Sequence, residues 1–179
     1  MSRSDITEIT VDDEVFNVRR SVLESKASFF KYPGLADVVK RPDGSMTITE
    51  IDANTFTHSV DRLDSGNYTG PIYVPHVKLF AFSRNYRIGG LDDCAIDNLR
   101  KAMSEGGITA ADVVELVGEM NKLWTVGNAM AADQLFKVVG IAVADKLMDV
   151  QGEAAFMGLL EQGGRFVPHL VTALGNRLG

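Results

Sequence analysis

Alternating apolar and polar residues at the start of the chain predict a β-hairpin. Residues 6–11 and 14–18 each show this alternation, which is typical of strands with one buried face. Asp12 and Asp13 lie between the two runs and are expected to form the turn. The chain is therefore predicted to begin with part of a small sheet.

A helix and a further strand are predicted next. Ser21 stands three residues before a glutamate, a capping-box spacing that predicts a helix beginning at Val22. The pattern at residues 35–39 is ambiguous and suits a short helix. Residues 40–45 are expected to form a turn that leads into a strand at 46–51.

Two end signals enclose a second helix. Asp52 suits the N-cap and Gly66 the left-handed position after the last turn, and the apolar residues between them follow helical spacing. Residues 70–75 hold two prolines and are expected to form a short strand or an extended connector. An apolar run at 77–86 and a helix that starts near Leu91 complete the first half.

The second half is predicted to be entirely helical. The Ser-Glu-Gly-Gly stretch at 104–107 is the best boundary, so domains are expected at residues 1–103 and 104–179. Thr109 and Asp112 resemble a capping box. The apolar stripes of the helices that follow are Val113, Leu116, Val117, Met120 and Leu123; Leu135, Val138, Val139, Ala142, Val143 and Leu147; Phe156, Leu159 and Leu160; and Phe166, Leu170, Leu174 and Leu178. We expect them to face the core, with a partner groove as the alternative.

Composition and charge exclude several kinds of partner. The chain has 179 residues and a formal charge of -6, and its basic residues are scattered, so no nucleic-acid partner is expected. No apolar run approaches the ~18 residues of a membrane helix, and the N-terminus lacks an apolar signal region. Cys94 is the only cysteine and is expected to be buried. We therefore expect the protein to reside in a reducing compartment, the cytoplasm or the nucleus.

No catalytic motif is recognisable in the sequence. His58, His76 and His169 are too dispersed for metal-ligand spacing, and each is expected to be a surface or hydrogen-bonded histidine. Adjacent acids such as Asp92 and Asp93 have a simpler use at turns and helix starts, where carboxylates accept hydrogen bonds from free amides. We therefore predict no cofactor, no metal, no catalytic residue and no enzymatic activity.

Three stretches, taken in order, resemble a BTB/POZ domain. The first, "EVFNVRRSVLESKASFF", is similar to the opening strand and helix of that family. Phe16, Val18, Leu23 and either Phe29 or Phe30 take its apolar positions. An arginine pair replaces the usual His-Lys pair at the end of the strand.

The other two stretches are "MTITEIDANTFTHSVDRLDSGNYTG" and "LFAFSRNYRIGGL". Their matching positions are Phe56, Leu63, Gly66 and Tyr68, followed by Phe82, Tyr86, Ile88 and Leu91. The resemblance covers residues 6–103, and the helices after it are similar to those of short fungal BTB proteins. Because little precedes the first strand, the layout is closer to potassium-channel tetramerisation domains and elongin C-related adaptors than to strand-swapped dimers.

The resemblance implies an α+β fold, a small β-sheet flanked by a helical cluster, followed by an all-α extension. It also implies a protein-interaction module that acts through self-association, partner binding or both. The alternative is a substrate adaptor of a cullin-RING ubiquitin ligase. The cullin contact often uses a hydrophobic-x-Glu pattern, and "KYPGLADVVKRPDGS" has no glutamate, so a cullin scaffold is weakly supported. A third alternative is an enzyme with a site between the two halves.

Five residues are predicted to contact a protein partner, which includes a second copy of the chain: Phe29, Phe30, Leu35, Val38 and Val39. One of the two phenylalanines is expected to face the core and the other the partner. Leu35 and the two valines form an apolar patch in this prediction. The alternative is that these three residues close the small core.

Overall fold

The chain folds into two compact units that combine a small sheet with many helices. The first unit holds Met1–Gly70 and Lys78–Cys94, and the second holds Pro71–Val77 and Ala95–Gly179. The fold class is therefore mixed α+β, as predicted. The computed structural model describes residues 5–26, 38–49, 51–66, 68, 73–125 and 129–178.

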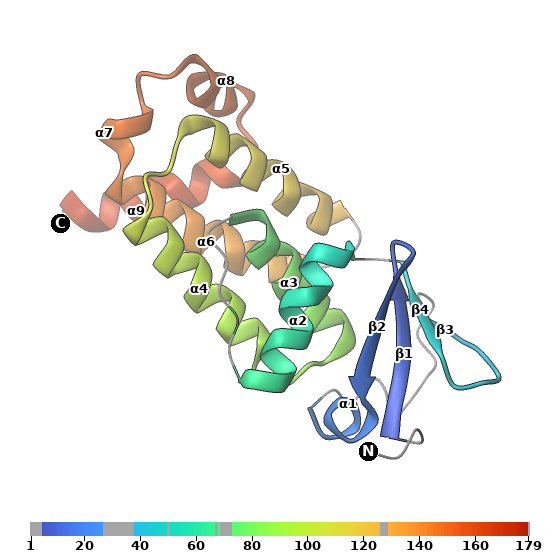
Figure 1. The fold of residues 1–179 in the computed structure, drawn as a ribbon. Coiled ribbons are helices and arrows are strands. Elements are labelled where there is room, and N and C mark those ends of the chain that lie inside the picture. The colour runs from blue at the N-terminus through green and yellow to red at the C-terminus, as the bar shows by residue number, and fades with distance from the viewer. Residues whose placement is uncertain are drawn as a thin grey trace. The chain divides into compact units, whose positions relative to one another are not determined.

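The predicted hairpin opens the first unit. Strands β1 (Ile6–Val11) and β2 (Glu14–Arg19) pair antiparallel and lie side by side in Figure 1. Asp12 and Asp13 connect them with φ angles of 47° and 66°. Two-residue hairpin turns commonly need positive φ at both central residues, and aspartate tolerates this conformation better than most residues do.

A second hairpin completes a four-stranded sheet in the order β2-β1-β4-β3. Strand β3 (Val38–Lys40) pairs antiparallel with β4 (Met46–Ile48), and β4 runs parallel to β1. The turn between them is as predicted: Arg41 N donates to Ser45 O at 2.9 Å, and Gly44 has a φ of 87°. Only glycine adopts that φ readily.

Two predictions near this hairpin are wrong. Val38 and Val39 belong to a strand, not to a short helix at 35–39, because pairing with β4 supplies their backbone hydrogen bonds. Helix α1 (Arg20–Lys26) begins before Val22, since β2 runs into it directly. Ser21 therefore lies inside the first turn of α1 and is not its N-cap.

Helix α2 (Ala53–Ser65) has both predicted end signals. The Asp52 carboxylate accepts from Thr55 N at 2.8 Å, and Gly66 follows the helix with a φ of 86°. A second carboxylate also serves this helix start: Asp12 of the first hairpin turn accepts from Ala53 N at 3.1 Å. Free amides at a helix start favour such negative groups. The hairpin turn and the helix are thus tied together across 41 residues of sequence.

The charge of Asp52 is expected to make stability depend on pH. Burial raises the pKa of Asp52, but hydrogen bonds from Lys78 and Thr55 outweigh this effect and leave the pKa below its ordinary value of 3.8. A carboxyl whose pKa is lowered in the folded state stabilises the fold above its unfolded pKa, and this contribution is lost as pH falls through the lowered value.

Asp52→Asn should therefore be less stable than wild type at pH 7, because asparagine retains the cap but loses the 2.7 Å ion pair with Lys78. The difference in unfolding free energy should shrink below about pH 4. Urea unfolding at stepwise lower pH measures it. A difference that stays constant with pH would show that the charge is not involved.

The core of the first unit lies between the inward sheet face and α2. Ile9, Val11, Val18 and Ile48 project from the sheet and are buried, as is Phe56 of α2. The Lys78–Tyr86 part of helix α3 (Tyr73–Tyr86) adds the buried rings of Phe82 and Tyr86. These rings match the positions at which the sequence predicts apolar side chains.

Helix α3 begins at Tyr73, so residues 73–75 are not the predicted strand or connector. Pro75 is its third residue, where the missing amide hydrogen would have had no partner within the helix. For this reason the proline does not interrupt the helix. None of the described helices combines the length and the apolar character needed to span a membrane.

Helices build the second unit. They are the start of α3 up to Val77, the later part of α4 (Leu91–Glu105), α5 (Ala110–Thr125), α6 (Ala129–Asp145), α7 (Leu147–Val150), α8 (Ala154–Gln162) and α9 (Phe166–Leu178). The predicted capping box opens α5, where Thr109 N and Oγ1 both donate to Asp112 at 2.8 and 2.7 Å. The expected break after Ser104 is also present, although the two compact units divide at Cys94–Ala95, inside α4. The domain boundary at 103 stays a prediction.

The predicted apolar stripes mostly face the core of this unit. Val113, Leu116, Leu135, Val139 and Phe166 are among the fully buried residues. Six stripe residues are only half-buried: Leu123, Ala142, Leu147, Leu159, Leu160 and Leu174. The sequence did not predict the short helix α7, which takes Leu147 out of the α6 stripe.

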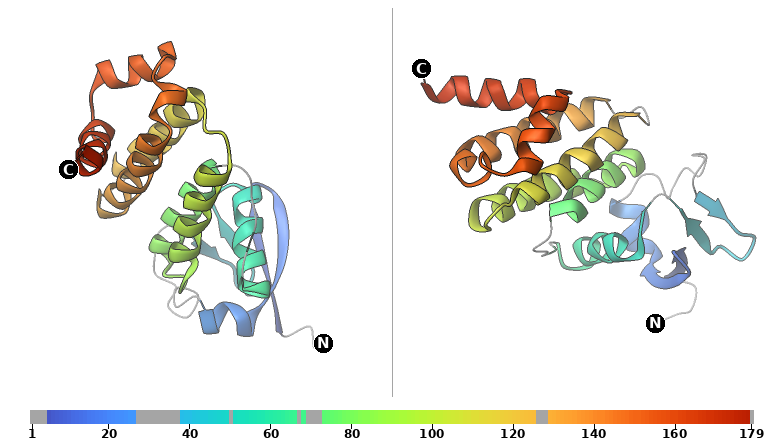
Figure 2. Two further views of the ribbon diagram at one scale, coloured as in Figure 1. Left: turned by 90° about the vertical axis from the view of Figure 1, so that its left-hand side faces the viewer. Right: turned by 90° about the horizontal axis from the view of Figure 1, so that it is seen from above.

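Helix α6 is the centre of this packing. It packs against both α5 and α9, and Figure 2 shows α9 beside it. At Gly140 the two helix backbones come close, because a Cβ there would lie 3.1 Å from the main-chain carbon of His169. A larger residue at this position would therefore require the two helices to move slightly apart.

Candidate protein-interaction site

The first unit carries a row of β-branched side chains across its sheet, with exposed valines at its two ends and half-buried threonines between them. In the strand register Val15 is opposite Thr10, Thr10 is opposite Thr47, and Thr47 is opposite Val39. All four point away from the buried face, because their neighbours Phe16, Ile9, Met46 and Ile48 point toward it. We call this surface the outward sheet face.

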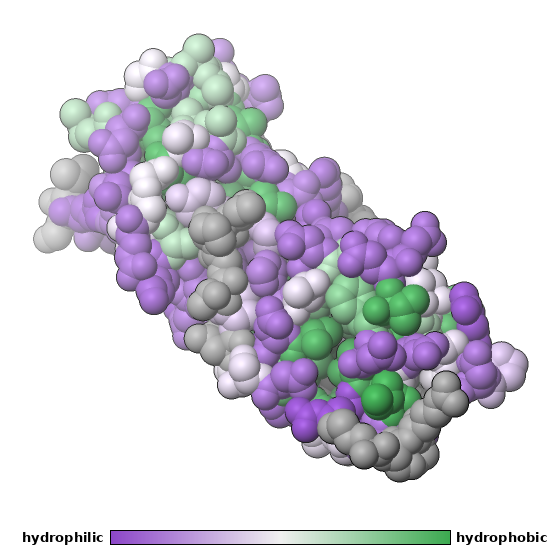
Figure 3. Space-filling model, in the orientation of Figure 1, coloured by the Kyte–Doolittle hydropathy of each residue, from purple (hydrophilic) through white to green (hydrophobic). Residues whose placement is uncertain are grey.

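The two valines of the row are unusually exposed. Val15 is 59% accessible and Val39 is 60% accessible, and Ile6 at the start of β1 is also exposed. Figure 3 shows hydrophobic side chains over the region of β1 and β2, separated by hydrophilic ones. A sheet with one solvated face normally places polar residues there. The two exposed valines are therefore the candidates on this face for contact with another surface.

A shallow hollow adjoins one end of the outward sheet face. It has a volume of about 510 Å³ and is lined by Ile6, Glu8 and Asn17 from the hairpin. Arg20 and the turn at residues 43–45 close its other side.

Charged groups border the outward sheet face. Arg19 pairs with Asp64 at 3.0 Å, and Arg41 donates to Thr47 Oγ1 at 3.4 Å. Hydrogen bonds from the Ser45 hydroxyl and amide hold the pKa of Asp43 below its usual range. The turn therefore presents a carboxylate that stays ionised in mildly acidic solution, beside an apolar surface.

One of the five predicted contact residues lies on this surface. Val39 is in the row, and its exposure contradicts the alternative in which it closes the core. For Val38 the structure describes the main chain in β3. Phe29, Phe30 and Leu35 lie outside the described residues.

Val15 is the contact candidate that the sequence prediction missed. The alternation of residues 14–18 already places it on the opposite face from Phe16 and Val18. That signal was sufficient to assign Val15 to the outward face. The pairing that brings Val15 and Val39 into one row depends on β4 inserting beside β1, and no local pattern specifies it.

The surroundings of His169 and Cys94 can be compared with the predictions made for these residues. His169 pairs with Asp133 at 3.0 Å and stacks on Phe136, as expected of a hydrogen-bonded histidine. Cys94, in α4, is half-buried rather than fully buried. Within the described ranges, no group of three or more histidine, cysteine, aspartate or glutamate residues is arranged to hold a metal ion.

No model of a protein family matches the sequence, and no curated protein sequence matches it. Function must therefore be inferred from the surfaces described above.

Proposed function

We propose that this chain is a non-enzymatic protein-interaction module of the BTB/POZ kind, which associates with itself or a partner through the outward sheet face. The row of Val15, Thr10, Thr47 and Val39, whose two valines are exposed, carries the proposal. The order of elements in the stretch that resembles the family supports the proposal: a hairpin, a helix, two further strands, an aspartate-capped helix and two more helices.

The size of the face sets the expected strength of association. Strands β1 and β2 have six residues each and β3 and β4 have three each, so the face covers only about 300 Å². A stable interface buries about 800 Å² on each partner. Self-association through this face alone is therefore expected at the weak end, with dissociation constants of about 1 to 100 µM.

Val15→Lys and Val39→Lys are expected to weaken self-association by at least about tenfold, because each replaces one of the two exposed valines at the ends of the row with a hydrated charge. Both residues lie on edge strands and face solvent, so the free monomer should keep its fold. Sedimentation equilibrium over a range of concentrations measures the association, and thermal unfolding checks the fold.

Val171→Lys is the matched control. Val171 is 60% accessible, as exposed as the two sheet valines, but lies on α9 of the second unit. The substitution makes the same change in charge and exposed apolar area. If wild type is monomeric at millimolar concentration, or if Val171→Lys weakens association as much as the sheet variants do, the outward sheet face is not the self-association surface.

A further inference from the structure

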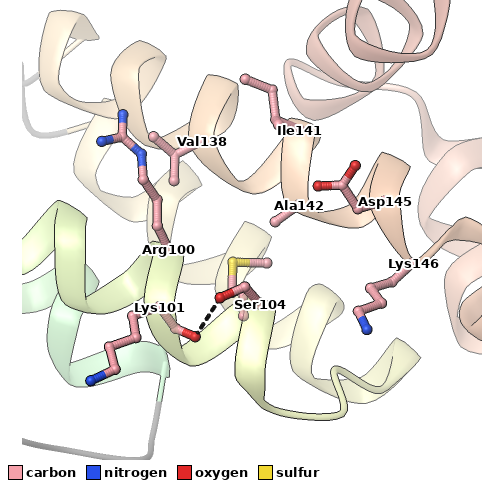
Figure 4. Close-up of a pocket in the computed structure, with 9 residues that line it drawn as sticks. Arg100, Lys101, Ser104, Val138, Ile141, Ala142, Asp145 and Lys146 are labelled. Atoms are coloured by element: carbon pink, nitrogen blue, oxygen red, sulfur yellow. Dashed lines mark hydrogen bonds between the residues drawn. The ribbon is translucent and has the colours of Figure 1, made fainter. Parts of the chain in front are cut away.

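The second unit contains a groove between α4 and α6 (Figure 4). Its volume is about 540 Å³. The lining residues of α6 are spaced by three and four positions, so they form one face of the helix, and those of α4 are similarly placed. The groove is therefore built mainly from two helix faces, and Lys146 in the turn after α6 lines one end of it.

The floor of the groove is apolar. Val138 and Met103 are buried there, and Ala142 is half-buried. Ile141 extends beside them and keeps 47% of its surface exposed. In Figure 4 the side chains of Ile141 and Ala142 lie between Arg100 at one end and Lys146 at the other.

Cations surround this apolar floor. Arg100, Lys101 and Lys146 line the groove, and the one lining carboxylate, Asp145, is already ion-paired with Arg177. Arg100 contacts Asp97 at 3.2 Å, an exposed pair that contributes little. Lys101 and Lys146 form no ion pair with any carboxylate in the described part of the chain. The groove is thus basic in a chain whose net charge is -6.

We propose that this groove binds an acidic amphipathic helix of a partner protein. Aliphatic side chains of that helix cover Ile141 and Ala142, and its carboxylates pair with Arg100, Lys101 and Lys146. Helix-in-groove recognition uses this combination of an apolar seam and flanking charges. The proposal goes beyond the outward sheet face and does not depend on it.

The charge distribution favours a peptide over an anionic lipid surface. A membrane attracts a protein through an extended basic patch, and here three cations belong to a chain with an excess of negative charge. A peptide can place its few carboxylates beside those three cations. It is small enough to stay away from the negatively charged remainder of the protein.

The test uses a designed fluorescent peptide with leucines at i, i+3, i+4 and i+7 and glutamates at its exposed positions, and fluorescence anisotropy of the full-length chain. A second peptide has lysine in place of each glutamate. The acidic peptide should bind, and its affinity should fall as salt is raised. The lysine peptide should bind at least about tenfold more weakly, because like charges then meet at the groove.

Substitutions in the groove test where the peptide binds. Ile141→Ser should weaken binding about fivefold through lost apolar contact. Lys146→Gln should weaken it about two- to fivefold, as for an exposed ion pair. Val114→Ser and Lys122→Gln, on α5 of the same unit, are the matched controls and should change little.

Several outcomes would overturn the proposal. They are equal binding of the two peptides, equal effects of the groove and control substitutions, and no binding of the acidic peptide at millimolar concentration. Ile141-dependent binding to phosphatidylserine vesicles without peptide binding would assign the groove to a lipid surface instead. Peptide binding that is lost in Ile141→Ser but kept in Val15→Lys would support the proposal independently of the outward sheet face.

Discussion

Phe56→Ala is expected to lower the free energy of unfolding of the first unit by about 3 to 5 kcal/mol. Phe56 is fully buried, and its ring makes edge contacts with Phe16 at 4.9 Å and Phe82 at 6.0 Å between centroids. It therefore joins the sheet, α2 and α3 within one core. Alanine removes the ring and both aromatic pairs, each of which contributes about 0.5 to 1.5 kcal/mol beyond burial.

Urea unfolding followed by circular dichroism measures this loss. Trp124 is the only tryptophan and lies in α5, so its fluorescence reports the second unit separately. Phe56→Leu is the control, because it keeps most of the apolar volume and should cost about 1 kcal/mol. A loss below about 1 kcal/mol for Phe56→Ala would show that the ring does not anchor this core.

Gly140→Ala is expected to destabilise the second unit by about 1 to 3 kcal/mol, although alanine is the better helix former. The added Cβ would lie 3.1 Å from the His169 main-chain carbon and 3.2 Å from Leu170 N. These are main-chain atoms of α9, so no side chain can rotate to make space. The helices α6 and α9 would have to move apart, which loosens the contacts of both.

Gly118→Ala is the matched control for this effect. Gly118 lies in α5, is exposed, and has nothing within 4 Å of the added Cβ. Replacing it should stabilise the chain by about 0.5 to 1 kcal/mol through helix propensity and a less flexible unfolded state. Tryptophan-monitored urea unfolding compares the two variants. If Gly140→Ala is as stable as Gly118→Ala, the close approach of α6 and α9 is not a constraint.

Local signals in the sequence predicted many of the elements and some of their ends. The hairpin at Asp12–Asp13, the Asp52 cap and the Gly66 end of α2 each depend on one or two neighbouring residues, and the structure confirms all three. The predicted start of α1 was wrong. The capping-box pattern covers only four residues and carries no information about the strand that leads directly into the helix.

Pairings between distant segments were not predictable in the same way. The outward sheet face needs β4 to lie beside β1, and the α4–α6 groove needs two helices about 40 residues apart in sequence to present matching faces. Stripe residues were predicted to be buried, yet Ala142 is only half-buried because it lines this groove. A stripe gives the apolar side of a helix but does not show how much of that side its neighbours cover.

The role of Asp12 restricts which amino acids can replace it during evolution. Its backbone has a φ of 47°, and its side chain accepts a hydrogen bond from the first amide of α2. Glycine adopts the positive φ without strain but has no side-chain acceptor. Glutamate and serine have an acceptor, but the positive φ strains their backbone. Among homologues that keep both hairpin and helix, position 12 is therefore expected to alternate between aspartate and asparagine, even though the residue is on the surface.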